Sequence, residues 1–200
     1  MTDLPITCRC GRLRLVARDV SPAVANHVVC ECQGCRDFAQ RMGATEILDA
    51  HGGTHRLQIS PATLAFAAGR EHLACMQQTK GGALRWYAAC CQTPMVLTLN
   101  ELAVPFVGID VARVEHPAVD DVIGPVRARV NSRLRGPDKA AHKATLGALL
   151  GMVAHLAPLT LRWWWRGDAK RTPFYDHGRP IEPIQHLYPM VKKQAFSGCA

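Results

Sequence analysis

Short stretches of alternating apolar and polar residues run through the first half of the chain. In Arg12–Val16, Leu13 and Leu15 alternate with arginines, which is the period of a half-buried strand. Similar short runs, separated by Gly and Pro, follow at residues 25–29, 55–61, 63–67, 71–76, 84–91, 96–99 and 104–109. Because strands this short must pair with one another to bury an apolar face, they predict a compact, mostly antiparallel β domain that ends near Arg113.

The second half has a different pattern. Residues 115–125 contain Pro117 and Pro125 and indicate a boundary. A short basic helix is predicted at about residues 126–135, and a second helix at about residues 138–165 with Asp138 as its N-cap. We therefore expect an α+β chain, with a mainly-β domain at residues 1–113 and a partly helical extension at residues 114–200.

The helix predicted at residues 138–165 contains a long uncharged stretch. Residues 144–161 include no Lys, Arg, Asp or Glu, and three tryptophans follow at 163–165. Eighteen helical residues are about 27 Å long, slightly less than a bilayer span, and Pro158 interrupts the run. The stretch is therefore expected to be a buried helix or a contact between two copies of the chain, with a membrane contact as the alternative. The tryptophans are expected to be packed anchors rather than a base-stacking platform.

Charge is unevenly distributed. Residues 1–112 hold ten Lys/Arg and nine Asp/Glu, whereas residues 113–200 hold fourteen and seven, of a total net charge of +8. The first part is therefore nearly neutral and the extension is basic. Basic surfaces most often serve solubility, so a nucleic-acid partner is not expected. An anionic partner for the extension is the alternative.

Eight of the nine cysteines lie in the first half of the chain and give it its chemistry. They include a C-x-C pair, a C-x-C-x-x-C cluster and an adjacent pair. The N-terminus has no basic segment followed by an apolar run, so we expect a cytoplasmic protein with reduced thiols. In that setting, clustered cysteines favour a bound metal over disulfides.

Zinc prefers thiolate ligands in a nearly tetrahedral arrangement. Cys30, Cys32 and Cys35 are three candidate ligands of one zinc whose fourth position stays open for water or substrate. The candidate ligands of a second zinc are Cys8, Cys10, Cys90 and Cys91, so one or two zinc ions are expected. Neighbouring residues on a strand point to opposite faces, so both members of the 90–91 pair bind one metal only if the backbone turns there. Otherwise Cys90 is free to close the first site.

Arg36 follows the C-x-C-x-x-C cluster directly. A guanidinium beside an open metal position can bind a substrate carboxylate through two hydrogen bonds. The alternative for Arg36 is an ordinary surface ion pair.

Three segments occur in a characteristic order: Cys8-Arg9-Cys10-Gly11, Cys30-Glu31-Cys32-Gln33-Gly34-Cys35-Arg36, and Cys91-Gln92-Thr93-Pro94. In these segments, and over residues 6–112, the chain resembles the family of glutathione-dependent formaldehyde-activating enzymes, which has the Mss4-like β-tent fold. The resemblance implies a structural zinc at the first and last segments. It also implies a catalytic zinc at the middle one, with Cys30, Cys32 and Cys35 as catalytic residues.

The last segment departs from the family pattern C-x-x-C-G-[ST]-P. Ala88 stands where the first cysteine is expected, Gln92 replaces the glycine, and Cys90 lies beside Cys91. These departures leave three states open for the second site: three-coordinate, completed by Cys90, or lost.

The resemblance implies a carbon–sulfur lyase that acts on a glutathione adduct or a related small thiol. Zn²⁺ with three thiolates has a net charge of −1, which favours exchange of a thiolate ligand over strong activation of water. The alternative is a non-catalytic zinc module that binds a protein partner through the basic, apolar extension. The fourth ligand of the first zinc distinguishes the two.

Overall fold

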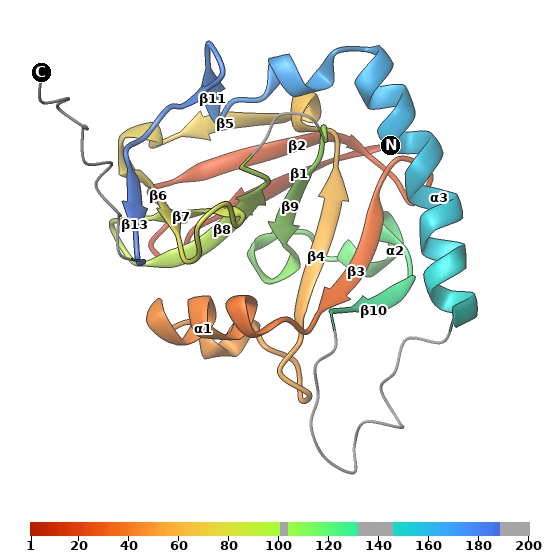
Figure 1. Ribbon diagram of the computed structural model, residues 1–200, viewed down its shortest axis with the longest axis horizontal. Coiled ribbons are helices and arrows are strands. Elements are labelled where there is room, and N and C mark those ends of the chain that lie inside the picture. The colour runs from red at the N-terminus through yellow and green to blue at the C-terminus, as the bar shows by residue number, and fades with distance from the viewer. Residues whose placement is uncertain (101–103, 132–145, 189–200) are drawn as a thin grey trace, which may run out of the picture.

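The computed structural model describes residues 1–100, 104–131 and 146–188, which form a mainly β protein with three α-helices (Figure 1). The largest sheet has eight strands in the order β10 (Ala128–Val130), β3 (Asn26–Cys30), β4 (Thr54–Ile59), β9 (Val107–Asp110), β8 (Thr93–Thr98), β7 (Leu84–Ala88), β6 (Leu73–Gln77) and β13 (Ile184–His186). A second sheet has the order β1 (Thr2–Thr7), β2 (Arg14–Val20) and β5 (Leu64–Ala68), and a two-stranded ribbon joins β11 (Tyr175–Asp176) to β12 (Arg179–Pro180). The helices are α1 (Gln33–Arg41), α2 (Val119–Ile123) and α3 (Leu146–Trp165). The α+β prediction is confirmed.

Both edges of the large sheet come from the second half of the chain. Strand β10 pairs with β3, and β13 with β6, in parallel, whereas the pairs between them are antiparallel. Phe174 is fully buried and its ring centroid lies 4.9 Å from that of Trp86 in β7. The sheet and its core therefore cross the boundary predicted at residue 113.

The helix predicted at about residues 126–135 is wrong in its described part. Ala128–Val130 form β10, and Ala128 is buried against the sheet. The edge of β3 offers unpaired backbone groups, and pairing with them outweighs the weak local preference of a basic segment for helix. The rest of that predicted helix, beyond Asn131, and the predicted start of the next at residues 138–145 lie outside the described residues.

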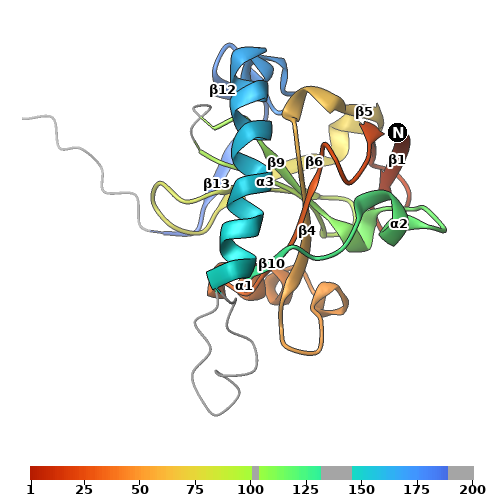
Figure 2. The same ribbon diagram turned by 90° about the vertical axis from the view of Figure 1, so that its right-hand side faces the viewer.

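Helix α3 is largely exposed, so the buried helix is wrong, whereas the contact between two copies of the chain stays a prediction. Only Leu159 and Trp163 are buried, whereas Leu150 is 60% and Trp165 81% exposed. Figure 2 shows α3 along one side of the molecule, beside β3 and β10. Its length and mean hydropathy of 1.3 would also suit a membrane span. The burial prediction fails because the helix is apolar all round and packs on one face only.

Two glycines in left-handed conformations test how tightly the β5–β6 connection packs against the turn between β1 and β2. Gly69, at φ +73°, joins β5 to β6, and an added Cβ would lie 1.9 Å from the backbone oxygen of Arg12. Gly81, at φ +70° between β6 and β7, has open space around it. We predict that Gly81→Ala costs only the left-handed strain, about 1–2 kcal/mol. Gly69→Ala should cost a further 1–3 kcal/mol or so because the backbone must shift. Urea unfolding of both variants measures the difference, and equal losses would contradict the close contact.

Candidate metal centre

Three thiols meet where β3 ends and α1 begins. Cys30 is the last residue of β3, Cys32 is the N-cap of α1, and Cys35 lies in the first turn of that helix. The extended conformation of Cys32, at φ −70° and ψ 148°, redirects the chain from strand to helix. Helix α1 thus begins directly after the second of the three thiols.

The spacing of these sulfurs fits a metal site. The three Sγ atoms lie within 4.8 Å of one another, and those of Cys30 and Cys35 are 3.7 Å apart. Two sulfurs bound tetrahedrally to one zinc, each at about 2.3 Å, lie roughly 3.8 Å apart. Cys30, Cys32 and Cys35 could therefore hold one ion without rearrangement.

A second cluster contains four thiols. The Sγ atoms of Cys8, Cys10, Cys90 and Cys91 lie within 4.8 Å of one another. The Sγ of Cys10 is 3.3 Å from that of Cys90, which is 3.8 Å from that of Cys91. These separations also suit sulfurs that share one ion.

The sulfurs of Cys90 and Cys91 can face the same cluster because these two residues do not lie on a strand. Cys90 and Cys91 occupy the turn between β7 and β8, and Gln92 has a positive φ of 52°. Gln92 stands where the formaldehyde-activating enzymes that the chain resembles have glycine, the residue that adopts this conformation most easily. Of the alternatives left open for the pair, the structure supports the one in which Cys90 completes the second cluster.

The other cysteines stay outside these clusters. The side chain of Cys75 is fully buried in the core, and burial raises its pKa to about 12. Cys199 lies outside the described residues. In the described part of the chain, no His, Asp or Glu joins either thiol cluster.

Two buried arginines lie against Cys35. Arg85 Nη1 is 3.7 Å and Arg56 Nη2 is 4.0 Å from the Sγ of Cys35. The pKa of the Cys35 thiol is lowered, first by hydrogen bonds from Cys30 and Cys32 and then by the two guanidinium charges. The pKa of Cys30 is raised, mainly by its bonds with Cys32 and Cys35. The cluster therefore concentrates negative charge on Cys35, beside the arginines.

The two arginines differ in their partners. Arg56 Nη1 lies 2.9 Å from Oδ2 of Asp110, which is itself buried. The guanidinium of Arg85 lies over the ring of Phe38, 5.1 Å from its centroid. Within the described residues Arg85 has no carboxylate partner, so the thiol cluster is the anionic group that compensates its charge.

A pocket of about 250 Å³ borders the three-thiol cluster. Its polar lining is Cys30, Cys32, Cys35, Arg56, Gln58, Arg85 and Asn131. Its apolar lining is Val28, Ala83, Leu97, Leu99, Phe106 and Val130. A small molecule in this pocket would reach both the sulfurs and the guanidinium groups.

Arg36, the predicted substrate-binding residue, points elsewhere. Its Nε donates to the backbone oxygen of Gly52 at 3.0 Å, and its Nη2 to that of His51 at 3.4 Å. It does not line the pocket, so Arg56 and Arg85 are the cations near the sulfurs. One signal in the sequence could have pointed to Arg85: it is the only charged residue in Leu84–Ala88, whose other members are apolar or aromatic. This strand is buried throughout.

Strand β10 holds the loop between the ligands. The Arg129 Nε donates to Oε1 of the buried Glu31 at 2.5 Å, and its Nη2 donates to Oδ2 of Asp49 at 2.7 Å. The backbone nitrogen of Glu31 donates to the oxygen of Val130 at 2.9 Å. Sequence reasoning missed this contact because it joins residues almost a hundred positions apart.

We predict that Arg129→Gln lowers the free energy of unfolding by about 2 kcal/mol or more, because Glu31 keeps a buried charge without its partner. Arg127→Gln is the matched control, since Arg127 on the same segment bonds through its side chain to the backbone oxygen of Pro22. Its loss should stay near 1 kcal/mol. Denaturant unfolding measures both losses. An unchanged free energy of unfolding in Arg129→Gln would show that β10 does not support the loop.

Comparison with known proteins places the chain in a family. Residues 1–185 match the profile of DUF6151, described as a family of unknown function, and the chain belongs to this family. Among curated proteins, none matches. A crystal structure of a Rhodobacter sphaeroides protein from a structural genomics programme is similar with a TM-score of 0.41 and 20% identity, over 61% of this chain and 96% of that chain.

Proposed function

We propose that this member of the DUF6151 family binds two zinc ions, and that it uses one of them to hold a small thiol or its adduct. The zinc at Cys8, Cys10, Cys90 and Cys91 is structural, and the zinc at Cys30, Cys32 and Cys35 takes the ligand. One observation carries the proposal: the three-thiol cluster borders a pocket, and the Cys90-Cys91 pair belongs to the other cluster.

The donor sets support this division. Sulfur ligands suit zinc better than the hard cations magnesium and calcium. Four thiols complete a tetrahedron, whereas three leave one position for a ligand from solvent. A zinc bound there supplies a Lewis acid that can accept a sulfur or oxygen of the substrate.

The surrounding charges prepare the pocket for an anionic sulfur. The buried positive charges of Arg56 and Arg85 oppose the negative charge of the thiolates, and Asp110 offsets part of the charge of Arg56. Hydrogen bonds to Cys35 draw electron density from its sulfur, which makes the cluster a better acceptor for a further thiolate. A thiol that enters the pocket would therefore lose its proton more readily.

Gln58 adds a polar contact in the pocket wall. Its Oε1 accepts a hydrogen bond from Nδ2 of Asn26 at 2.7 Å. This contact fixes the amide and leaves its Nε2 as the donor for a ligand. The apolar side chains opposite would hold a short carbon chain.

The resemblance to the glutathione-dependent formaldehyde-activating enzymes supports a carbon–sulfur lyase reaction. In such a reaction the bond between a thiol sulfur and an aldehyde-derived carbon forms or breaks, and a proton moves between sulfur and oxygen. The arginines and Gln58 would orient the adduct. A non-catalytic zinc module, the alternative, needs no pocket beside its thiols.

Metal content tests the two-site arrangement. We predict two zinc ions per intact chain, one in the double variant C30S/C32S and one in C8S/C10S. The core variant Cys75→Ser should keep both. Elemental analysis of purified, folded protein gives these values, and one ion or none in the intact chain would contradict the arrangement.

Cobalt replacement tests the open position. Visible d–d bands of the cobalt-loaded protein should change when glutathione is added and should not respond in C30S/C32S. Cys32→Ser should also lower any turnover of glutathione with formaldehyde at least 100-fold. Unchanged bands in the intact protein would mean that the three-thiol site accepts no thiol. Changed bands without turnover would support thiol binding at the three-thiol site and contradict the proposed lyase activity.

A further inference from the structure

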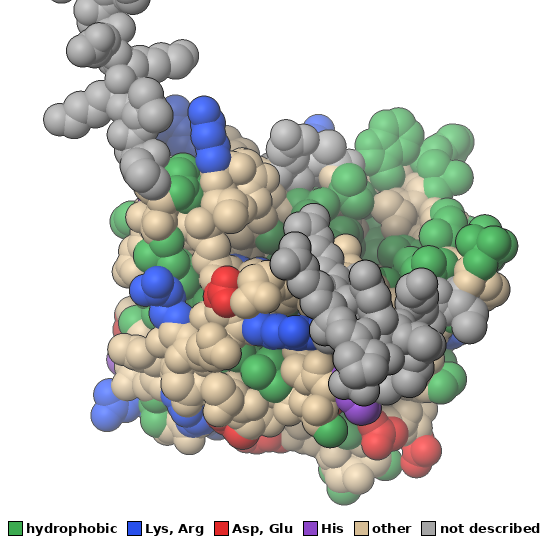
Figure 3. All heavy atoms as spheres, turned by 60° about the horizontal axis from the view of Figure 1, so that its bottom comes forward, with side chains coloured by type: hydrophobic (Ala, Val, Ile, Leu, Met, Phe, Trp, Pro, Cys, Tyr) green, Lys and Arg blue, Asp and Glu red, His purple; other side chains and the backbone are tan. Residues whose placement is uncertain are grey.

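The exposed face of α3 is apolar along nearly the whole helix. Leu146–Leu161 contain no Lys, Arg, Asp or Glu. The outward side chains recur at helical spacing and are large at Leu146, Leu150, Val153, Leu161 and Trp164. Figure 3 shows hydrophobic side chains gathered on the side of the molecule where α3 lies. Such contiguous faces on proteins mark contact surfaces.

The opposite face holds α3 on the protein. Leu159 and Trp163 are buried, and a ring nitrogen of His155, Nε2, lies 2.9 Å from the backbone oxygen of Ala25. Val104 and Pro105 flank the outward face and form with it an apolar groove of about 480 Å³. The helix is therefore anchored on one side and open to a partner on the other.

Charges follow at the tryptophan end of α3, and the exposed ones are positive. Arg162, Arg166, Lys170 and Arg171 are exposed. Asp168 is the one acidic residue between positions 146 and 175. It is fully buried, pairs with Arg171 and, at 3.6 Å, with Arg166, and accepts a hydrogen bond from Ser60 at 2.6 Å.

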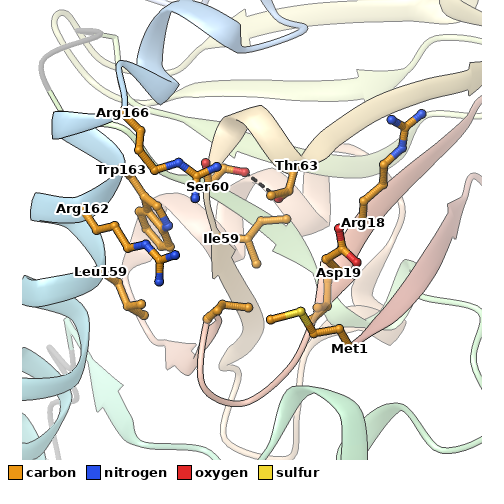
Figure 4. Close-up of a pocket in the computed structure, with 12 residues that line it drawn as sticks. Met1, Arg18, Asp19, Ile59, Ser60, Thr63, Leu159, Arg162, Trp163 and Arg166 are labelled. Atoms are coloured by element: carbon orange, nitrogen blue, oxygen red, sulfur yellow. Dashed lines mark hydrogen bonds between the residues drawn. The ribbon is translucent and has the colours of Figure 1, made fainter.

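Two of these arginines line a pocket beside the helix. Figure 4 shows the side chains of Arg162 and Arg166 extending from α3 into a pocket of about 240 Å³, with Trp163 between them and Ser60 opposite. Arg162 has no carboxylate partner among the described residues. Arg18 and Asp19 also line this pocket, so three arginines and one aspartate leave it with a net positive charge along the flank of an apolar helix.

We propose that α3 docks the protein on the surface of an anionic phospholipid membrane. The outward leucines and Val153 enter the region between headgroups and acyl chains, and Trp164 and Trp165 lie at the headgroup level. Arg162 and Arg166 bind lipid phosphates at the flank of the helix. Apolar insertion and basic attraction together give the two signals that stable membrane-surface binding requires.

Other occupants fit these features less well. A membrane span would break the packing of Leu159, Trp163 and His155 on the protein. In a parallel pair of α3 helices, the exposed Arg162 and Arg166 of one copy would lie beside the same arginines of the other. Nucleic acid stacks on aromatic rings and gains nothing from an aliphatic face.

Vesicle sedimentation of the intact chain tests the docking. We expect binding to vesicles of phosphatidylcholine with 30% phosphatidylserine, weak binding to phosphatidylcholine alone, and loss of affinity as salt rises. Arg162→Gln and Arg166→Gln should each lower the partition coefficient roughly five-fold. Arg70→Gln, which changes an exposed arginine on the β5–β6 connection, should leave it unchanged. Leu150→Gln should also weaken binding several-fold, while metal content stays the same.

Three outcomes would overturn the proposal. The first is absence of binding to the anionic vesicles. The second is binding that neither salt nor the arginine substitutions alter. The third is a dimer in sedimentation equilibrium that Leu150→Gln converts to monomer, which would show that a second copy covers α3. Because metal content and thiol binding are measured separately, failure here leaves the proposed zinc chemistry standing.

Discussion

The guanidinium groups of Arg56 and Arg85 lie buried beside the sulfur of Cys35. A buried cation is stabilised by a nearby anion, and Asp110 pairs directly with Arg56 but not with Arg85. The two guanidinium groups therefore favour an anionic form of the thiol cluster, either a thiolate alone or three thiolates on a metal. The polarity of the pocket and the proposed ligand class depend on this pairing.

Two structural supports keep the cluster in place. Strand β10 fixes the loop from outside through Glu31 and Arg129, and the four-thiol cluster brings the turn between β1 and β2 beside the turn between β7 and β8. These supports come from separate parts of the chain. The three-thiol site is thus built into the whole fold, which agrees with a family profile that spans residues 1–185. The second half of the chain supplies both edge strands of the large sheet and is not a separate extension after it.

Local patterns predicted the strands and the grouping of Cys30, Cys32 and Cys35, because alternation and C-x-C-x-x-C spacing act over a few residues. The second cluster joins distant segments and was expected from the order of the cysteine segments that carries the family resemblance. The sequence could not reveal contacts across the fold. Nothing near Arg129 indicates that it pairs with Glu31, and nothing near Arg85 indicates that it faces a sulfur. The exposure of α3 was also hidden, since a helix that is apolar all round gives no sign of which face is covered. The position of the Cys90-Cys91 pair depends on a turn in which Gln92 has a positive φ. Because a residue other than glycine seldom adopts this conformation, the sequence did not indicate the turn.

The central claim is that Cys30, Cys32 and Cys35 hold a zinc ion with an accessible fourth position. A crystal structure of the zinc-loaded protein, with anomalous data at the zinc edge, tests it most directly. We expect a zinc peak about 2.3 Å from each of the three sulfurs, with a fourth ligand from solvent or a small molecule in the pocket. A fourth ligand from the protein, or no zinc at these three sulfurs, would contradict it.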